Sequence, residues 1–262
     1  MGIPSGHEDE PYIFTTIRWD PTFAACAENT GASADLPCPF YMLEHHRARL
    51  NAASVAKWRR PLAKDGTSDL ISTLTSAVMQ WHAKHPEETP ESLRVRHSIH
   101  ADDRSSTQIT ALHRIAIDRC FPVGFGVPED RPDDIEWTIC LAQASVDSSV
   151  DTKHKTSDRA VYERARASAG ITDFKQTKEV LLYDHQGAVL DASICTPYFF
   201  RDGRWITPRT EHGGQQGTTR RWALEQGFCV EGTVKKEDLR AGEVVWLSNA
   251  VRGYFRAVYR PI

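Results

Sequence analysis

Alternating apolar and polar side chains predict strands at both ends of the first 140 residues. Residues 12–19, YIFTTIRW, alternate around β-branched side chains, which is typical of a strand with one buried face. Apolar residues then recur every three or four positions over 41–58 and 68–84, and this spacing favours two amphipathic helices. Further strands are predicted where strong β formers partly alternate, at 93–100, 107–117 and 136–142. Together these elements predict a mixed α/β unit of ordinary domain size.

A small, polar stretch, QASVDSSVDT, separates this unit from a strand-rich second half. Its lack of large apolar residues is typical of a linker or surface loop. The elements predicted after it are a helix at 159–168, hairpins at 179–191 and 197–207, a helix at 218–228, and strands at 242–249 and 253–260. The sequence therefore predicts two domains, residues 1–143 and 153–262, joined by a linker at 144–152.

The composition of the chain disfavours several classes of function. The chain has 262 residues with 32 Lys and Arg against 35 Asp and Glu, so it has no general field for nucleic acid or an anionic membrane. Its six cysteines form neither a CxxC pair nor a zinc pattern, which predicts buried, reduced thiols and no metal site. The N-terminus is polar and acidic rather than signal-like, so we expect a soluble, cytoplasmic protein.

Four segments carry residues suited to chemistry. The first, HKTSDRAVY at 154–162, is by itself only a basic turn before a helix, where a lysine is usually a surface residue. The others are LEHHRARL at 43–50, VLDASICTPYFF at 189–200 and GGQQGTTR at 213–220. A glycine-rich turn into a helix can bind an anion, because unpaired backbone N–H groups and the helix dipole point at it. This turn lacks the GK[ST] ending of a nucleotide P-loop, so ATP and GTP are disfavoured.

Taken in order, these segments resemble the class IV aminotransferases, which are fold type IV enzymes that use pyridoxal 5′-phosphate (PLP). HKTSDRAVY is similar to the HKTxxRxxY stretch around the cofactor lysine in the aminodeoxychorismate lyase-like branch, and SNAVRG at 248–253 is similar to that branch's TNSxxG segment. The resemblance implies a small α/β N-terminal domain, a strand-rich, barrel-like C-terminal domain, and PLP in the cleft between them.

The resemblance also implies roles for particular residues. Lys155, rather than Lys153, would carry PLP as a Schiff base. Arg49 would bind the PLP phosphate, because a guanidinium can bind two oxygens at once and stays charged. Thr218 and Thr219 would hold the phosphate from the opposite side.

Asp191 takes the position of the acid that pairs with the pyridine nitrogen. A carboxylate there keeps the nitrogen protonated, so the ring can withdraw electrons from the reacting carbon. The family usually has Glu, and Asp is one methylene shorter, so either the strand approaches the ring more closely or a water bridges the gap. Thr196 stands where the family usually has Asn, which puts any Asn-dependent contact in doubt.

The activity implied is conversion of 4-amino-4-deoxychorismate to 4-aminobenzoate and pyruvate. Lys155 would take the proton from the carbon bearing the nitrogen. By the family's pattern a hydroxyl on the opening strand would protonate the leaving group, and Thr16 fits best, although Thr15 is adjacent and would face the other side of the sheet. The alternative is a class IV transaminase, which uses an (R)-amine, a D-amino acid or a branched-chain amino acid with a keto acid. A non-catalytic relative is disfavoured, because a decayed site should have lost some of these residues.

Two features stay open at this stage. The resemblance implies a homodimer in which each subunit closes the other's active site. The residues that would bind substrate carboxylates are undecided among three arginines: Arg18, Arg104 and Arg252.

Overall fold

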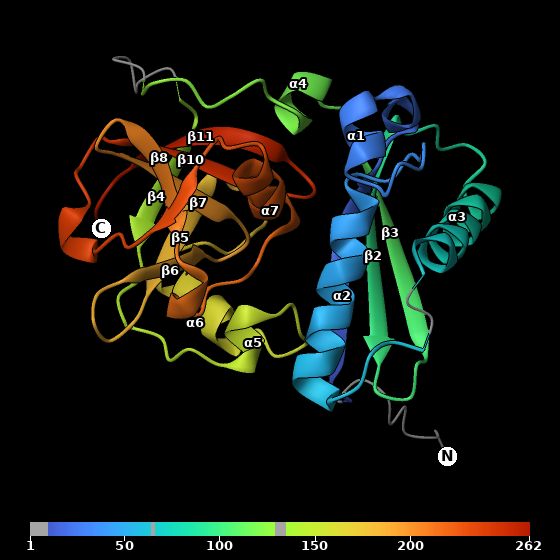
Figure 1. Cartoon of the computed structure of the whole chain (residues 1–262), viewed down its shortest axis with the longest axis horizontal. Coiled ribbons are helices and arrows are strands. Elements are labelled where there is room, and N and C mark those ends of the chain that lie inside the picture. Colours follow the sequence, from blue (N-terminus) through green and yellow to red (C-terminus); the bar gives the residue numbers. More distant parts are fainter. Residues whose placement is uncertain (1–9, 64–65, 129–134) are drawn as a thin grey trace.

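The computed structural model describes residues 10–63, 66–128 and 135–262, which form two lobes (Figure 1). Residues 1–9, on which the expectation about a targeting signal rests, lie outside the described residues. The first lobe is an antiparallel sheet in the order β1 (Tyr12–Trp19), β2 (Ser92–His100), β3 (Ser105–Leu112), with helices α2 (Leu43–Trp58) and α3 (Thr67–Lys84). These five elements confirm the strands and helices expected before residue 112.

The N-terminus of α2 is held by side chains from the preceding segment. Asn29 Oδ1 accepts a hydrogen bond from the Met42 N–H at 2.8 Å, and Ser33 Oγ accepts one from the Leu43 N–H at 3.1 Å. Asn29 belongs to the short helix α1 (Ala27–Gly31), which follows the 3-10 turn η1 (Pro21–Ala25). Met42 has a φ of 50°, so α2 begins at Leu43 rather than at residue 41 as expected.

The second lobe is a curled sheet of eight strands in the order β6-β5-β4-β11-β10-β7-β8-β9. The strands are β4 (Trp137–Leu141), β5 (Lys178–Tyr183), β6 (Val189–Ala192), β7 (Thr196–Arg201), β8 (Arg204–Pro208), β9 (Val230–Gly232), β10 (Val244–Asn249) and β11 (Gly253–Tyr259). The curl brings edge strand β6 back to the chain after β9, where the Val189 N–H donates to the Val234 oxygen at 2.8 Å. The expected barrel-like shape is therefore confirmed.

Short helices complete this lobe and the connection to it. They are α4 (Ile117–Cys120), α5 (Val150–Lys153), α6 (Ala160–Ser168), α7 (Thr218–Glu225), and the 3-10 turns η3 (Thr210–His212) and η4 (Lys236–Asp238). In Figure 1, α6 and α7 lie on opposite sides of the curled sheet, and α2 lies between this lobe and the first sheet.

Two details of the sequence reading are wrong. We grouped β4 with the strands of the first half, but it pairs in parallel with β11 and β5 of the second sheet. Alternation identifies a strand but not its partner, which is why the grouping failed. The strand expected at 107–117 ends at Leu112, and α4 occupies its last position. The domain boundary at residues 144–152 stays a prediction, although α5 begins inside that segment.

Backbone hydrogen bonds along the free edge of β1 join the two lobes. Phe14 N–H donates to the Lys155 oxygen at 2.9 Å, and Ser157 N–H donates to the Tyr12 oxygen at 2.8 Å. Farther along the same edge, Arg18 N–H donates to the Ala250 oxygen at 3.1 Å. Because β1 has no strand partner on this side, its backbone fixes the position of Lys155 relative to the first lobe.

Three further observations concern disulfides, metal sites and membrane-spanning helices. All six cysteines are buried and none forms a disulfide. Among the described residues, no three His, Cys, Asp or Glu side chains are grouped so that they could hold a metal ion. Across the same ranges, every helix is too short or too polar to span a lipid bilayer.

Candidate active site

Lys155 extends from the interlobe edge into a half-buried position. Its Nζ lies 3.3 Å from Gln215 Oε1 and 5.2 Å from the ring centroid of Phe14. Burial, followed by the charges of Arg159, Arg49 and Arg96, holds the pKa of the Lys155 amine well below its ordinary value, and Asp191 opposes this shift. The amine is therefore neutral over more of the physiological range than an exposed lysine, as a nucleophile or base must be.

Arg49 is fixed by two side chains that the sequence reading did not assign to the site. Its Nη2 donates to Thr15 Oγ1 and lies 3.3 Å from His46 Nδ1, and the Thr15 hydroxyl lies 2.6 Å from the same His46 nitrogen. Burial lowers the pKa of Arg49 to about 10, so it stays charged at neutral pH. Burial and Arg49 hold the pKa of His46 well below its usual value, so His46 is neutral and accepts through Nδ1.

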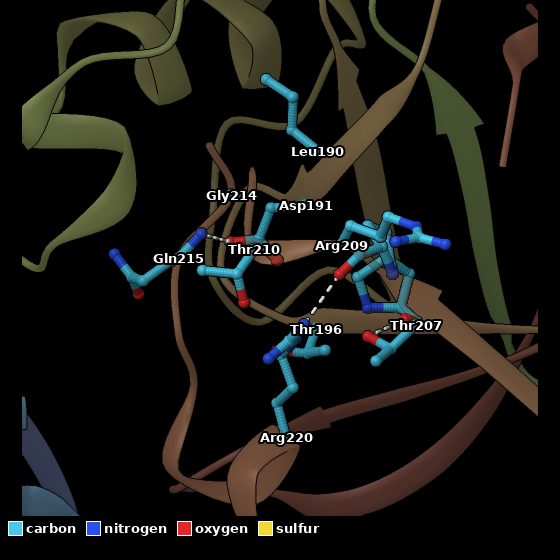
Figure 2. A pocket seen from close by; sticks show the side chains of 11 residues that line it. Leu190, Asp191, Thr196, Thr207, Arg209, Thr210, Gly214, Gln215 and Arg220 are labelled. Carbon is cyan, nitrogen blue, oxygen red and sulfur yellow. Dashed lines mark hydrogen bonds between the residues drawn. The ribbon is translucent and has the colours of Figure 1, made fainter. Parts of the chain in front are cut away.

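Asp191 lies on β6 beneath the glycine-rich loop (Figure 2). Its Oδ2 accepts a hydrogen bond from the Gln215 N–H at 3.3 Å, and burial raises the pKa of the carboxyl group to about 8. Gln215 thus contacts Asp191 through its backbone and Lys155 through its side chain. The loop therefore brings the predicted acid and the predicted lysine to the same site.

Glycine is required for this close approach. A β-carbon at Gly214 would lie 2.0 Å from the Leu190 oxygen, and one at Gly217 would lie 2.8 Å from Thr196 Oγ1. The side chains around the narrow pocket beneath the loop come from β6, β7, β8 and α7, as Figure 2 shows. Thr196 thus lies directly below the loop, with its hydroxyl oxygen next to Gly217.

The N-terminus of α7 presents the two predicted threonines differently. Thr218 Oγ1 is buried without a hydrogen-bond partner among the described residues. Thr219 Oγ1 accepts from Ser248 Oγ at 2.8 Å, and the Tyr254 hydroxyl donates to the Thr219 oxygen at 2.6 Å. Thr218 is therefore available to a ligand through its side chain, whereas the side chain of Thr219 already belongs to an internal network.

Buried donors without acceptors show what kind of molecule fits here. Within the described ranges, several buried side-chain atoms of this site have no partner: Arg49 Nε, His46 Nε2, Arg159 Nη1, Gln215 Nε2 and Thr218 Oγ1. Each can donate a hydrogen, and leaving a buried donor unpaired costs roughly 1–3 kcal/mol. The site therefore suits an anionic, acceptor-rich molecule with a phosphate, and the residues present fit PLP.

The face of the first sheet next to Lys155 carries Thr16 and an excess of positive charge. Thr16 is opposite Arg96 in the strand register, and Arg96 Cζ lies 3.6 Å from the Phe14 ring centroid. Burial, followed by the charges of Arg96 and Arg252, lowers the pKa of neighbouring Arg94. No carboxylate of the described residues forms an ion pair with these three arginines, so this face suits a ligand with carboxylates.

The three arginines considered as carboxylate ligands are placed differently. Arg18 donates to the Val251 oxygen at 2.7 Å and to the His113 oxygen at 3.0 Å, so backbone groups occupy it. Arg104 forms exposed ion pairs with Asp102 and Glu10. Arg252 donates to the Phe174 oxygen at 2.6 Å, and its charge lowers the pKa of Arg94. The sequence reading did not name Arg94 or Arg96.

The fold and this site define a class of protein. Residues 13–258 match the model of the amino-transferase class IV family, so the chain belongs to the class IV aminotransferases, whose members are PLP enzymes. A solved structure from Mesorhizobium loti, provisionally titled an amino-acid aminotransferase, superimposes with a TM-score of 0.68 at 21% identity and covers 97% of this chain and 100% of that one. The two-domain, fold type IV architecture expected from the sequence is confirmed.

Two curated relatives carry the name aminodeoxychorismate lyase. A Schizosaccharomyces pombe protein, provisionally named an aminodeoxychorismate lyase, is 34% identical over 137 residues, which cover 50% of this chain and 59% of that protein. The aminodeoxychorismate lyase of Saccharomyces cerevisiae is 25% identical over 141 residues, which cover 48% of this chain and 38% of that protein. The chain thus spans about half the length of the curated relatives it matches.

Replacing Gly214 by Ala tests the loop that carries Gln215. The added β-carbon would meet the Leu190 oxygen, so we expect the loop to shift, with a loss of about 1–3 kcal/mol of stability and at least about tenfold weaker PLP binding. Thermal unfolding and a PLP titration measure the two effects. Gly31→Ala is the control, because nothing lies within 4 Å of a β-carbon at Gly31. Equal PLP affinity in the two variants would contradict the role given to this loop.

Proposed function

We propose that this protein binds PLP and converts 4-amino-4-deoxychorismate to 4-aminobenzoate and pyruvate. The observation that carries the proposal is the combination of a lysine whose pKa is lowered, a buried acid and a set of unpaired donors with a cationic face beside them. The substrate has an amine and two carboxylates, which match the lysine side and the cationic face of the site. The relatives named as aminodeoxychorismate lyases support the same reaction.

Each group that would hold the cofactor is available. Lys155 Nζ would bond to the aldehyde carbon, and Asp191 would lie at the ring nitrogen. Arg49, oriented by Thr15 and His46, would bind the phosphate together with Thr218 at the start of α7. When bound, PLP supplies a protonated ring that withdraws electrons from the substrate carbon bearing the amine.

The chain's own residues would then move two protons. Lys155 Nζ takes the proton from the carbon that bears the amine, since a lowered pKa leaves more of this amine in the basic, unprotonated form. The C–O bond to the enolpyruvyl group breaks, its electron pair leaves with the oxygen, and the Thr16 hydroxyl protonates that oxygen. The ring becomes aromatic, and the released enol becomes pyruvate. Arg94 and Arg96 would hold the substrate carboxylates during these steps.

The substrate requirement tests this function. With PLP and 4-amino-4-deoxychorismate alone, we expect 4-aminobenzoate and pyruvate in a 1:1 ratio, measured by chromatography and by a coupled lactate dehydrogenase assay. The likeness to the Mesorhizobium loti aminotransferase favours a transaminase as the second candidate. A transaminase would instead need an amino donor with a keto acid, and activity only under those conditions would contradict the lyase. We also propose a homodimer, which light scattering would test.

Thr16→Ala separates the proposed proton donor from cofactor binding. We expect turnover to fall about 100-fold with PLP affinity unchanged, because loss of a general acid slows only the chemical step. Thr15→Val is the matched variant: it removes the hydroxyl that contacts Arg49 and His46, so PLP affinity should fall instead. Steady-state kinetics and PLP titration measure both. Full lyase turnover in Thr16→Ala would remove this residue from the mechanism.

A further inference from the structure

Two helices from different lobes, α2 and α7, carry the groups proposed to bind the phosphate (Figure 1). Arg49 lies on α2, and Thr218 is the first residue of α7. The two helices are joined by a pair of side chains, because His45 Nε2 lies 3.2 Å from Glu225 Oε2. His45 is one helical turn before Arg49, and Glu225 is the last residue of α7. The pair therefore links the two elements that would hold the phosphate from opposite sides.

His45 depends on Glu225 for a polar partner. The residue is 6% exposed, and apart from the Glu225 contact neither ring nitrogen has a hydrogen-bond partner among the described residues. Burial lowers the pKa of His45 and so favours the neutral ring, although the charge of Glu225 opposes this shift. A neutral ring with its hydrogen on Nε2 donates to the carboxylate. Because a buried donor without an acceptor is costly, this contact favours one separation of the two helices.

Glu225 is held in place from within α7. Arg221 Nε donates to Glu225 Oε1 at 2.8 Å from one helical turn away, which leaves Oε2 for His45. The carboxylate therefore has a fixed position relative to the start of α7. A shift of α2 against α7 at this point would move the Arg49 guanidinium group relative to Thr218.

Resting on the proposed function, we propose that His45 and Glu225 are a positioning pair that sets the separation of Arg49 and Thr218 and so the affinity for the phosphate of PLP. Neither member of the pair touches the cofactor in this scheme. Apolar packing also supports α7, since the Trp222 ring lies 5.3 Å from the Phe121 ring, centroid to centroid. This packing would remain when the pair is removed, so we expect the variants to fold.

A positioning role and a purely structural role differ in the part of the cofactor that they affect. Pyridoxal has the ring and the aldehyde of PLP but lacks the phosphate. A pair that aligns only the phosphate-binding groups should leave the affinity for pyridoxal unchanged, whereas a general loosening of the fold should weaken the binding of both molecules. The ratio of the two affinities, compared between variants, therefore reports the positioning role without any measurement of turnover.

The experiment is a titration of the cofactor-free protein with PLP and with pyridoxal, followed by the visible absorption band. We expect His45→Leu and Glu225→Ala each to weaken PLP binding about three- to tenfold and pyridoxal binding by less than about twofold. The double variant should lose no more PLP affinity than the weaker-binding single variant, because both residues act through one contact. His45→Gln keeps a donor and should retain most of the affinity. Glu163→Gln, which removes an exposed carboxylate from α6, is the control.

Three results would overturn the inference: equal losses of PLP and pyridoxal affinity, a lower melting temperature with both affinities unchanged, or additive losses in the double variant. If His45→Leu does not fold, Glu225→Ala decides, because the Glu225 side chain is 44% exposed. The proposed function fails in a different way. A wild type that binds PLP without producing 4-aminobenzoate contradicts the lyase reaction, while the ratio of the two affinities still measures the effect of this pair.

Discussion

Lys155→Ala is expected to abolish lyase activity, with a loss of at least about 10⁴-fold, and to remove the visible absorption band of the PLP-loaded protein. The expectation follows from the double use of one nitrogen. Lys155 Nζ would attach the cofactor and would also remove the substrate proton, so a single substitution eliminates both. Activity assays, together with spectra before and after borohydride, measure the two losses. In the wild type, borohydride should fix the cofactor to the chain permanently.

Lys153→Ala is the matched control for this experiment. Lys153 ends α5 two residues before Lys155, so the two variants lose the same side chain from one short segment. The control should keep its band, its reduction by borohydride and its activity. If Lys153→Ala lost the band and Lys155→Ala kept it, the cofactor lysine would have been assigned one position out of register. A mass shift on the peptide that contains the reduced lysine would identify the residue directly.

The sequence predicted the bounds of helices and strands more accurately than it predicted which strands pair. Strand β1 and helix α3 lie within one residue of their expected bounds, because alternation and helical spacing are local properties of the chain. Strand β4 was grouped with the wrong sheet, because its partners β5 and β11 lie far along the sequence. The start of α2 depends on Asn29, whose side chain caps it from another helix, and no local pattern shows such a contact.

The residues of the candidate site also fall into those that the sequence could predict and those that it could not. Lys155, Arg49 and Asp191 could be proposed because they lie in motifs that resemble those of a family. His46 lies in one of these motifs, three residues before Arg49, and this i, i+3 spacing on a helix is a signal that could have been used. The amide contacts of Gln215 could not have been found, since they depend on how closely a glycine-rich loop approaches β6.

Asp191→Asn is expected to lower lyase turnover by about 10³-fold while leaving the cofactor-free protein at least as stable as the wild type. An amide cannot keep the ring nitrogen protonated, so the electron withdrawal that the reaction needs is lost. The variant should lose no stability when the cofactor is absent, because burial raises the pKa of Asp191 from 3.8 to about 8 in the folded chain and so favours the uncharged form. The folded protein thus binds this proton more tightly than the unfolded chain does.

The sign of that shift sets the pH window for the measurement. Since the folded pKa lies above the unfolded one, the stability that the protonated carboxyl contributes is full below pH 3.8 and is lost as the pH rises through about 8. Asn carries no ionisable proton, so the wild type should lose stability relative to Asp191→Asn between pH 5 and pH 9. Thermal unfolding of the two cofactor-free proteins at these pH values measures the difference. A stability difference between the two proteins that stayed constant over this range would show that Asp191 is ionised in the folded protein.

Asp191→Glu then separates the need for a carboxylate from the need for this particular length. A longer side chain would reach toward the loop at Gly214, where the space is limited, so we expect turnover within about tenfold of the wild type together with weaker PLP binding. The retained acid preserves protonation of the ring nitrogen, whereas Asn removes it. If Asp191→Asn and Asp191→Glu lost the same amount of turnover, geometry rather than charge would control this position, and the carboxylate would lose its proposed role.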